Sequence, residues 1–346
     1  MTGTDGLVDA VDRLCSATSS AAPQAAFDKS AWDSLEQAGF TLVPIPERLG
    51  GSGGTLSQAA DVLRAASRHA IGVPLAETMW LAGWLLAASD VPVPAGPLTA
   101  AVAGDDVTLT RAADGWRLDG TLRRVPWARH AAEIVVLATA GNGPVVVRVG
   151  GGRAELHLGH NLAGEPRDDV LLDGVRVAGD DVVPAGAGVS AEMFRSHAAL
   201  ARVVALSGAA EQVLNLCLRY AGERVQFGRP LIAFQAVQQL VAQLAGEVAA
   251  LVVSGQAAST KLAEDAAHCV WAAKAAAAES AGVVAAIGHQ IHGAMGMTIE
   301  HPLYRSTTRL WSWREEYGNE QAHYQALGRL VAATDPWELI TGLDRR

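Results

Sequence analysis

The sequence predicts an α+β protein that is mainly helical, with a helical domain in residues 1–95, a small β-domain in residues 96–184 and a four-helix bundle in residues 185–346. Three observations predict this order. Apolar residues recur at helical spacing near the front, short β-branched runs fill the middle, and long proline-free stretches follow. Strands and helices do not alternate, and no GxGxxG motif follows a predicted strand. The sequence therefore does not predict the βαβ fold of a dinucleotide-binding domain.

The first domain contains two segments with apolar residues at helical spacing, residues 30–38 and 56–69. Thr55 precedes the second segment and is placed to cap it. Residues 45–54 lie between the two segments and are rich in Gly and Pro, which indicates a loop. The most apolar stretch of this domain, residues 78–88, is too short to span a bilayer.

The middle domain carries the signals of short strands. Asp114-Gly115 precedes residues 116–120, which is a hairpin signal, and residues 134–138 and 145–149 are short apolar runs rich in β-branched side chains. Gly, Asn and Pro separate these runs. A small β-domain is therefore expected.

The sequence of the last domain predicts long helices. No proline occurs between residues 185 and 229 or between residues 231 and 301. The alanine-rich stretch of residues 271–287 is predicted to be a buried helix that packs closely. Residues 232–250 place five apolar side chains on one helical face: Val237, Leu240, Val241, Leu244 and Val248. Long helices joined by short loops predict a four-helix bundle.

Composition narrows the class of protein. The net charge is -9 and no basic run is present, which argues against nucleic acid as a partner. The three cysteines are far apart and form no CxxC pair, so neither a metal site nor a disulfide framework is expected. The first residues lack the basic and apolar pattern of a signal peptide. We expect a cytoplasmic protein that is not inserted in a membrane.

The segment Glu223-Arg-Val-Gln-Phe-Gly-Arg-Pro-Leu231 contains Arg224, and Gln235 follows eleven residues after that arginine. This motif, together with the order of the domains and the passage Pro46-Glu-Arg-Leu-Gly-Gly-Ser-Gly53, resembles the acyl-CoA dehydrogenase family across nearly the whole chain. The resemblance implies an FAD cofactor contacted by Arg224, Phe227 and Gln235. A guanidinium fork suits the pyrophosphate, and a glutamine amide suits another polar part of the cofactor.

A second motif near residue 290 also resembles the family. The segment Gln-Ile-His-Gly-Ala-Met-Gly is similar to a turn that lies against FAD, with an alanine in place of one glycine. The resemblance implies cofactor contacts from five of its residues: Gln290, Ile291, Gly293, Ala294 and Gly296. It also places Asn319 beside the cofactor, because residues 317–320 occupy the place of the family's Glu-Gly-Thr-Ser stretch. His289 and His292 are interpreted as structural.

The catalytic base of the family has no clear counterpart. The family removes a proton α to the thioester with a glutamate, while FAD accepts hydride from the β-carbon. Counting along the chain from one side places Tyr317 at the base position, and counting from the other side places Arg314 there. Glu315 and Glu316 lie in the disputed interval and are the two possible bases of this chain. A tyrosine does not readily replace a carboxylate, because its pKa is about 10.

Two further family features are incomplete. Some relatives carry the base just before an arginine of an earlier helix, but here Ala201 precedes Arg202, so only Arg202 remains as a possible substrate contact. In the β-domain, the motifs that flank the flavin ring are missing, and residues 125–128 keep only an aromatic side chain. The chain thus retains motifs for the ADP half of FAD and loses those for the ring half.

This pattern indicates a subunit that completes the FAD site of a partner. The chain resembles the shorter subunit of the two-subunit acyl-CoA dehydrogenases of actinobacterial steroid degradation. The resemblance implies an acyl-CoA substrate, possession of the base by the partner subunit, an electron-transfer flavoprotein as acceptor, and a dimer or tetramer. Three alternatives stay open: a self-sufficient dehydrogenase that uses Glu315 or Glu316, a non-catalytic scaffold, and a flavin-dependent oxidase or monooxygenase of the same fold.

Overall fold

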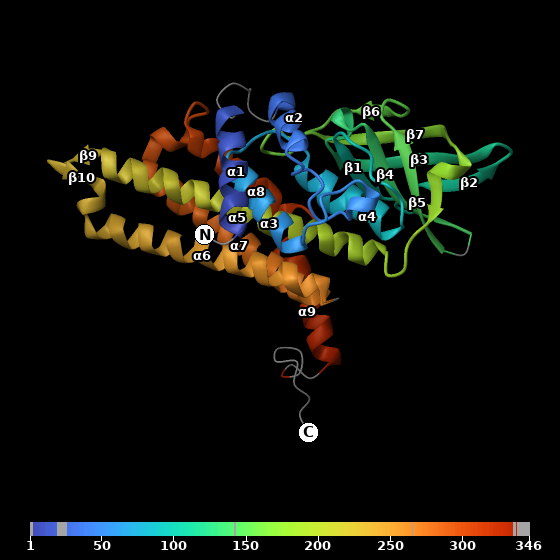
Figure 1. The fold of residues 1–346 in the computed structure, drawn as a ribbon. Coiled ribbons are helices and arrows are strands. Elements are labelled where there is room, and N and C mark those ends of the chain that lie inside the picture. Colours follow the sequence, from blue (N-terminus) through green and yellow to red (C-terminus); the bar gives the residue numbers. More distant parts are fainter. Residues whose placement is uncertain (1–2, 19–25, 142, 265, 335–336, 338–346) are drawn as a thin grey trace.

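The chain folds in the predicted order of helices, β-strands and helices, as Figure 1 shows. This computed structural model describes residues 3–18, 26–141, 143–264, 266–334 and 337. The strands of the middle domain lie at one end of the molecule and the long helices extend away from them.

Two N-terminal helices lie where the apolar periodicity predicts them, α2 (Lys29–Gln37) and α3 (Leu56–Arg68). The domain also contains α1 (Gly3–Thr18), the π-helical segment η2 (Glu77–Ala82) and α4 (Gly83–Ala88). The predicted cap of α3 is present as a capping box. The Thr55 hydroxyl accepts a hydrogen bond from the Gln58 amide at 3.2 Å, and the Gln58 side chain accepts one from the Thr55 amide at 2.8 Å. The glycine-rich loop before α3 contains one short turn, η1 (Glu47–Leu49).

The β-domain is a sandwich of two four-stranded sheets. One sheet has the order β1-β4-β5-β8 and the other the order β2-β3-β7-β6. Only β1 and β4 pair in parallel in these two sheets. Apolar residues of both sheets meet between them. The strands are β1 (Leu98–Val102), β2 (Thr108–Ala112), β3 (Gly115–Pro126), β4 (Glu133–Ala140), β5 (Gly143–Gly150), β6 (Glu155–His157), β7 (Arg167–Val177) and β8 (Val182–Pro184), with short turns η3 (Ala128–His130) and η4 (Gly179–Asp181).

The C-terminal part is a bundle of long helices. A protruding hairpin joins α5 to α6, and Figure 1 shows it at the end of the bundle farthest from the β-domain. The elements are α5 (Ala191–Glu223), β9 (Val225–Gln226), β10 (Arg229–Pro230), η5 (Leu231–Ala233), α6 (Gln235–Ala263), α7 (Ala267–His292), η6 (Gly293–Met297), α8 (Pro302–Glu315) and α9 (Glu320–Ala333). The main core packs α5, α6, α7 and α8 against α1 and α3.

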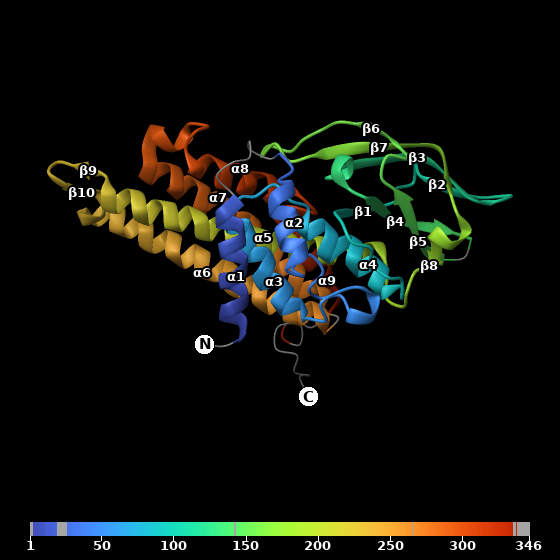
Figure 2. The same ribbon diagram turned by 45° about the horizontal axis from the view of Figure 1, so that its top comes forward.

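Two segments of the bundle are long and apolar enough to cross a membrane by length and composition alone. They are α6 and the continuous segment Ala267–Met297. The second contains the stretch that the sequence predicts to be a buried helix, and 56% of its most apolar window is buried. Only 17% of the corresponding window of α6 is buried, and Figure 2 shows α6 along the edge of the bundle.

Candidate functional site

A network of three arginines and three glutamates is buried where the bundle meets the β-domain. Its members come from η2, the loop before β7, the first residue of β7, α5, α8 and the turn after α8. Their side chains are 1–5% exposed except for the last glutamate, which is 15% exposed. The formal charges cancel within the network, which is a requirement for burying so many ions. The six residues are Glu77, Glu165, Arg167, Arg202, Arg309 and Glu316.

Glu316, one of the two expected bases, lies between two arginines. Arg202 Nε donates to Glu316 Oε2 at 2.7 Å, and Arg167 Nε donates to Glu316 Oε1 at 2.9 Å. Asn161 Nδ2 adds a third donor at 3.1 Å from Oε1. Burial raises the pKa of Glu316, but the attraction of Arg167 and Arg202 outweighs it and brings the pKa down to about 2. A carboxylate with so low a pKa and with both oxygens bonded is a poor general base.

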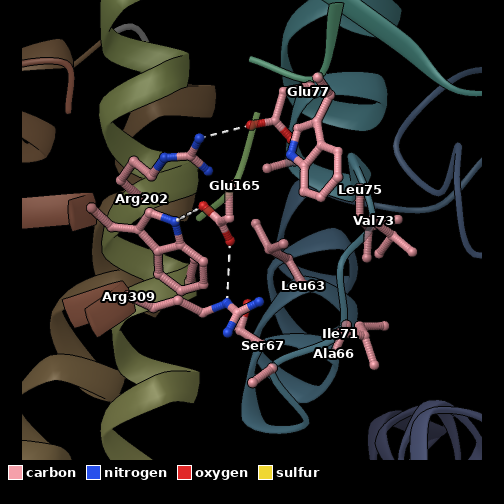
Figure 3. A pocket seen from close by; sticks show the side chains of 15 residues that line it. Leu63, Ala66, Ser67, Ile71, Val73, Leu75, Glu77, Glu165, Arg202 and Arg309 are labelled. Atoms are coloured by element: carbon pink, nitrogen blue, oxygen red, sulfur yellow. Dashed lines mark hydrogen bonds and ion pairs between the residues drawn. The ribbon is translucent and has the colours of Figure 1, made fainter. Parts of the chain in front are cut away.

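Arg202, the expected substrate contact, makes two ion pairs inside the chain. Besides its bond to Glu316, Arg202 Nη2 donates to Glu77 Oε1 at 2.7 Å (Figure 3). Its guanidinium lies 5.8 Å from the ring centre of Trp313 and 5.6 Å from that of Tyr317. These contacts hold a guanidinium that is almost completely buried, since the side chain is 4% exposed.

Glu165 organises the other half of the network. Its carboxylate accepts hydrogen bonds from Arg309 Nε at 3.1 Å, from Arg167 Nη2 at 3.1 Å and from Trp313 Nε1 at 2.8 Å. Burial raises the pKa of Glu165, and the attraction of Arg309 and Arg167 more than reverses this, so the pKa lies below its usual value. The network thus ties α8 to the start of β7 through charges that remain ionised.

A small cavity lies on the side of the network that faces α3. Figure 3 shows its apolar wall, formed by Leu63, Ile71, Val73 and Leu75, facing the charged side chains. The volume is about 40 Å³. That is room for about three water molecules, whereas ligand pockets usually measure about 300–1,000 Å³. This side of the network therefore cannot hold an acyl group in this conformation.

A larger cavity of about 600 Å³ opens on the other side of Glu316 and Tyr317. Glu315, the second expected base, lines it, and its side chain is 56% exposed. Asn319 Nδ2 donates to Glu315 Oε2 at 3.2 Å. Trp311 also lines this cavity. Unlike Glu316, Glu315 is a carboxylate that solvent can reach.

Tyr317 occupies the place directly before the glycine of the turn. Its backbone is in the left-handed region, with φ 58°, and burial raises the pKa of its phenol well above the usual value. Gly318 is required there, because a Cβ would lie 2.7 Å from His323 Nε2. Lys274 Nζ fixes the turn by donating to the carbonyl oxygens of Arg314 and Gly318, at 2.7 Å each. A phenol held in this way is not a proton acceptor near neutral pH.

The first group of expected cofactor residues lies on the hairpin at the far end of the bundle. Arg224 follows the last residue of α5 and is exposed, and Gln235 is the exposed first residue of α6. Phe227 is 92% exposed with φ 50°, and its ring packs only edge-on against Phe234, with centroids 6.1 Å apart. The guanidinium of Arg224 contacts the side-chain oxygen of Gln226 when that amide is oriented to accept, at 2.8 and 3.3 Å. These side chains point to solvent rather than into this chain.

The second group, around residue 290, lies at the same end of the bundle. Gln290, Gly293 and Ala294 are exposed, and Ile291 and Gly296 are buried. The backbone at Gly293 has φ 62° with open space beside it, whereas a Cβ on Gly296 would lie 2.7 Å from His292 Cβ. The alanine that replaces a family glycine is tolerated, because Ala294 is not among the residues with positive φ.

The Tyr220 ring stacks on His292 at 4.6 Å, which joins the last turn of α5 to the end of α7. The structure therefore brings both groups of expected cofactor residues to one end of the bundle. It separates them from Arg202, because Arg224 follows 22 residues later on the same helix and lies about 33 Å away. The two sets cannot form one compact site.

Asn319 does not join the cofactor residues at the bundle end. It is the N-cap of α9, where its Oδ1 accepts a hydrogen bond from the Ala322 amide at 3.2 Å. Trp127, the aromatic residue that remains where the family has a flavin-ring motif, is 2% exposed and lines the small cavity rather than the larger one. Both side chains therefore have structural positions within this chain.

Sequence reasoning missed four members of the network: Glu77, Glu165, Arg167 and Arg309. One signal was available. Arg309 falls on the same helical stripe as the buried residues Leu303, Leu310 and Trp313, and a charge in a buried stripe must find a partner. Its partner, Glu165, is 144 residues earlier, so its identity was not visible in the sequence.

Comparisons with known proteins agree with this architecture. Residues 185–331 match the model of the family described as acyl-CoA dehydrogenase, C-terminal domain. The chain is 30% identical over 290 residues to acyl-CoA dehydrogenase IpdE2 of Mycobacterium tuberculosis, covering 80% of this chain and 79% of that protein. It is similar to the structure of the ChsE4-ChsE5 complex from Mycobacterium tuberculosis, with a TM-score of 0.85, 25% identity, and coverage of 96% of this chain and 98% of that one. It is also similar to a variant of the Tcur3481-Tcur3483 steroid ACAD, with a TM-score of 0.81, 25% identity, and coverage of 95% and 98%.

Proposed function

Because the chain belongs to the acyl-CoA dehydrogenase family, we propose that it is the subunit of a two-chain dehydrogenase that completes the FAD site of its partner. In this enzyme an acyl-CoA thioester is dehydrogenated between its α and β carbons. The partner supplies the flavin-ring pocket and the catalytic base. This chain supplies contacts to the ADP end of FAD.

The observation that carries the proposal is the neutral ionic network. It holds the Glu316 carboxylate between Arg167 and Arg202, and the cavity on the side of the network that faces α3 measures only about 40 Å³. Opening this interior for an acyl group would separate buried ion pairs, which is costly. A chain built in this way is suited to support chemistry at another subunit's site.

The residues at the bundle end fit the polar half of FAD. Arg224 offers a guanidinium fork to a pyrophosphate, and Gln235 and Gln290 offer amide groups, all at exposed positions. Gly293 adds a backbone that a ligand can approach closely. Bound FAD would supply the hydride acceptor. The role of this chain is to hold and orient its polar end.

We further propose a steroid-derived, ring-bearing acyl group and an electron-transfer flavoprotein as the electron acceptor. The first rests on the likeness to a steroid ACAD built from two different chains. The second rests on the family resemblance. Neither requires that this chain contact the acyl group.

One observation favours a second function, a self-sufficient dehydrogenase. Glu315 lines the cavity of about 600 Å³ and is accessible to solvent. With FAD in that cavity, Glu315 would be placed to accept a proton. This alternative requires a stoichiometric flavin in the isolated chain.

The test is the flavin content per chain. The chain is purified alone and after co-expression with the acyl-CoA dehydrogenase encoded beside it, and the flavin absorbance is measured against protein concentration. Little flavin in the isolated chain and about one FAD per pair of unlike chains are expected. One FAD per isolated chain would overturn the shared site and support the role of Glu315.

A further inference from the structure

Another cavity opens on a different side of α5 from the ionic network. It measures about 270 Å³, and its walls come from α3, α4, the loop before α5, the first turns of α5 and the end of α6. It shares no lining residue with the cavities of about 40 and 600 Å³. His197, which lines it, and Arg202 are five residues apart on α5, so their side chains point about 140° apart around the helix. The cavity is therefore separate from the network.

The polar group of this cavity is a buried histidine. His197 is 8% exposed, and within the described residues neither of its ring nitrogens makes a hydrogen bond. Its ring stacks on the indole of Trp84, with centroids 4.1 Å apart and planes inclined by 23°. Burial lowers the pKa of His197 to about 3, so the ring is neutral at physiological pH. A buried polar group without a partner is costly and calls for a water, ion or ligand to complete it.

The rest of the lining is mainly apolar. Among the described residues that form the cavity there is no Asp, Glu, Lys or Arg, so a charged ligand would find no counter-ion. A cavity of about 150 Å³ lined by apolar side chains is known to bind benzene, so a volume of about 270 Å³ gives room for one or two rings. The larger apolar side chains are Leu56, Val189, Met193 and Leu262.

The rim of the cavity is held in place within the chain. Gly186 packs against the end of α4, where a Cβ would lie 1.7 Å from the Ala88 carbonyl oxygen, and its amide donates to Ser89 Oγ at 3.1 Å. The Gly186 carbonyl oxygen in turn accepts a hydrogen bond from the Val189 amide at 3.1 Å. These contacts fix the loop before α5, and the ring stack fixes the opposite wall. A ligand would therefore lose little affinity to the ordering of the site.

We infer that this cavity binds a neutral small molecule of one or two rings that carries a hydroxyl group. The rings would fill the apolar part, and the hydroxyl would give the His197 ring the hydrogen bond that it lacks. A hydroxyl both donates and accepts, so it suits either neutral tautomer of the imidazole. The inference goes beyond the proposed function, because the cavity includes none of the expected cofactor or base residues, and it holds whether or not the chain shares FAD with a partner.

The test uses two probes of equal shape, 4-methylphenol and p-xylene, in which a methyl group replaces the hydroxyl. NMR titration of the full chain, observed at the indole N–H of Trp84, should show saturable binding of 4-methylphenol with a Kd of about 1 mM or tighter. His197→Phe keeps a ring against Trp84 and removes both nitrogens. It should raise the Kd for 4-methylphenol about tenfold and leave that for p-xylene within about twofold. The variant should fold, because the lost nitrogens have no partner.

A second variant tests the place of binding independently of His197. Ala263 is an exposed residue at the rim, and the indole of Ala263→Trp should block the cavity and abolish binding of both probes. Ala332→Trp is the matched control, because Ala332 is an exposed alanine of α9 that does not line this cavity. It should leave both Kd values within about twofold.

Three results would overturn the inference. Absence of saturable 4-methylphenol binding to the wild-type chain would mean that the cavity holds only water. Binding that survives Ala263→Trp would place the probes elsewhere on the chain. An equal effect of His197→Phe on both probes would show that the imidazole makes no hydrogen bond to the hydroxyl.

Discussion

Arg202 and Glu316 are joined by a hydrogen bond of 2.7 Å although they lie 114 residues apart in the sequence. Each had been expected to act on a ligand, Arg202 as a substrate contact and Glu316 as a base. In the folded chain the two side chains form an ion pair with each other. The bond ties the middle of α5 to the turn after α8. Glu316 also accepts hydrogen bonds from Arg167 and Asn161, and Arg202 also donates to Glu77.

Replacing Glu316 should therefore affect stability more than chemistry. Glu316→Gln leaves Arg167 and Arg202 without their shared anion, and breaking such a buried pair costs about 3–5 kcal/mol. We expect that loss in the free energy of unfolding, measured with urea. The control is Glu315→Gln, one residue away and exposed, which should change it by less than about 0.5 kcal/mol. An unchanged stability with lost activity would identify Glu316 as a base instead.

Lowering the pH should remove the contribution of Glu316 to the free energy of unfolding in the wild-type chain. The folded pKa of Glu316 is about 2, below the value of about 4.3 expected for an unfolded glutamate. Its stabilising effect is thus present above pH 4.5 and lost as the pH falls toward 2. Urea unfolding at pH 6 and pH 3 should give a wild-type minus Glu316→Gln difference that shrinks at the lower pH. A constant difference would mean that the pKa of Glu316 is the same in the folded and the unfolded chain.

At the bundle end, Arg224→Ala should release FAD from the complex with the partner. A charged, bidentate contact to phosphate contributes about 1.5–3 kcal/mol, so the Kd for FAD should rise about 10- to 100-fold. Flavin absorbance after gel filtration measures the retention. Arg176→Ala is the control, because Arg176 is an exposed, ion-paired arginine of β7 in the β-domain. Equal retention in both variants would favour a scaffold without flavin contact.

Glu315→Gln should leave dehydrogenation by the complex within about twofold, because the partner carries the base in the shared-site proposal. Removing a true catalytic base typically lowers the rate by about 10²–10⁴-fold. The assay follows reduction of the flavin by an acyl-CoA substrate in single-turnover experiments. A drop of that size would show that Glu315 of this chain acts as the base, and it would support the self-sufficient alternative.

Much of the fold could be predicted because its signals are local. The capping residue Thr55, the Asp114-Gly115 turn and the proline-free helices each reflect backbone preferences within a few residues. The glycine at position 296 is also explained locally, because the side chain of His292 leaves no room for a Cβ. Length and apolar periodicity then fix the order of the layers.

The candidate site was less predictable, because the role of a charged side chain depends on what it meets in space. The sequence by itself determined that a family-like motif contains Arg224 and that Glu315 and Glu316 are the two possible bases of this chain. Only the tertiary structure decided that Glu316 is neutralised by Arg167 and Arg202 while Arg224 stays exposed. The physical reason is that Coulomb attraction and burial depend on distance and solvent access, and neither can be read from sequence separation.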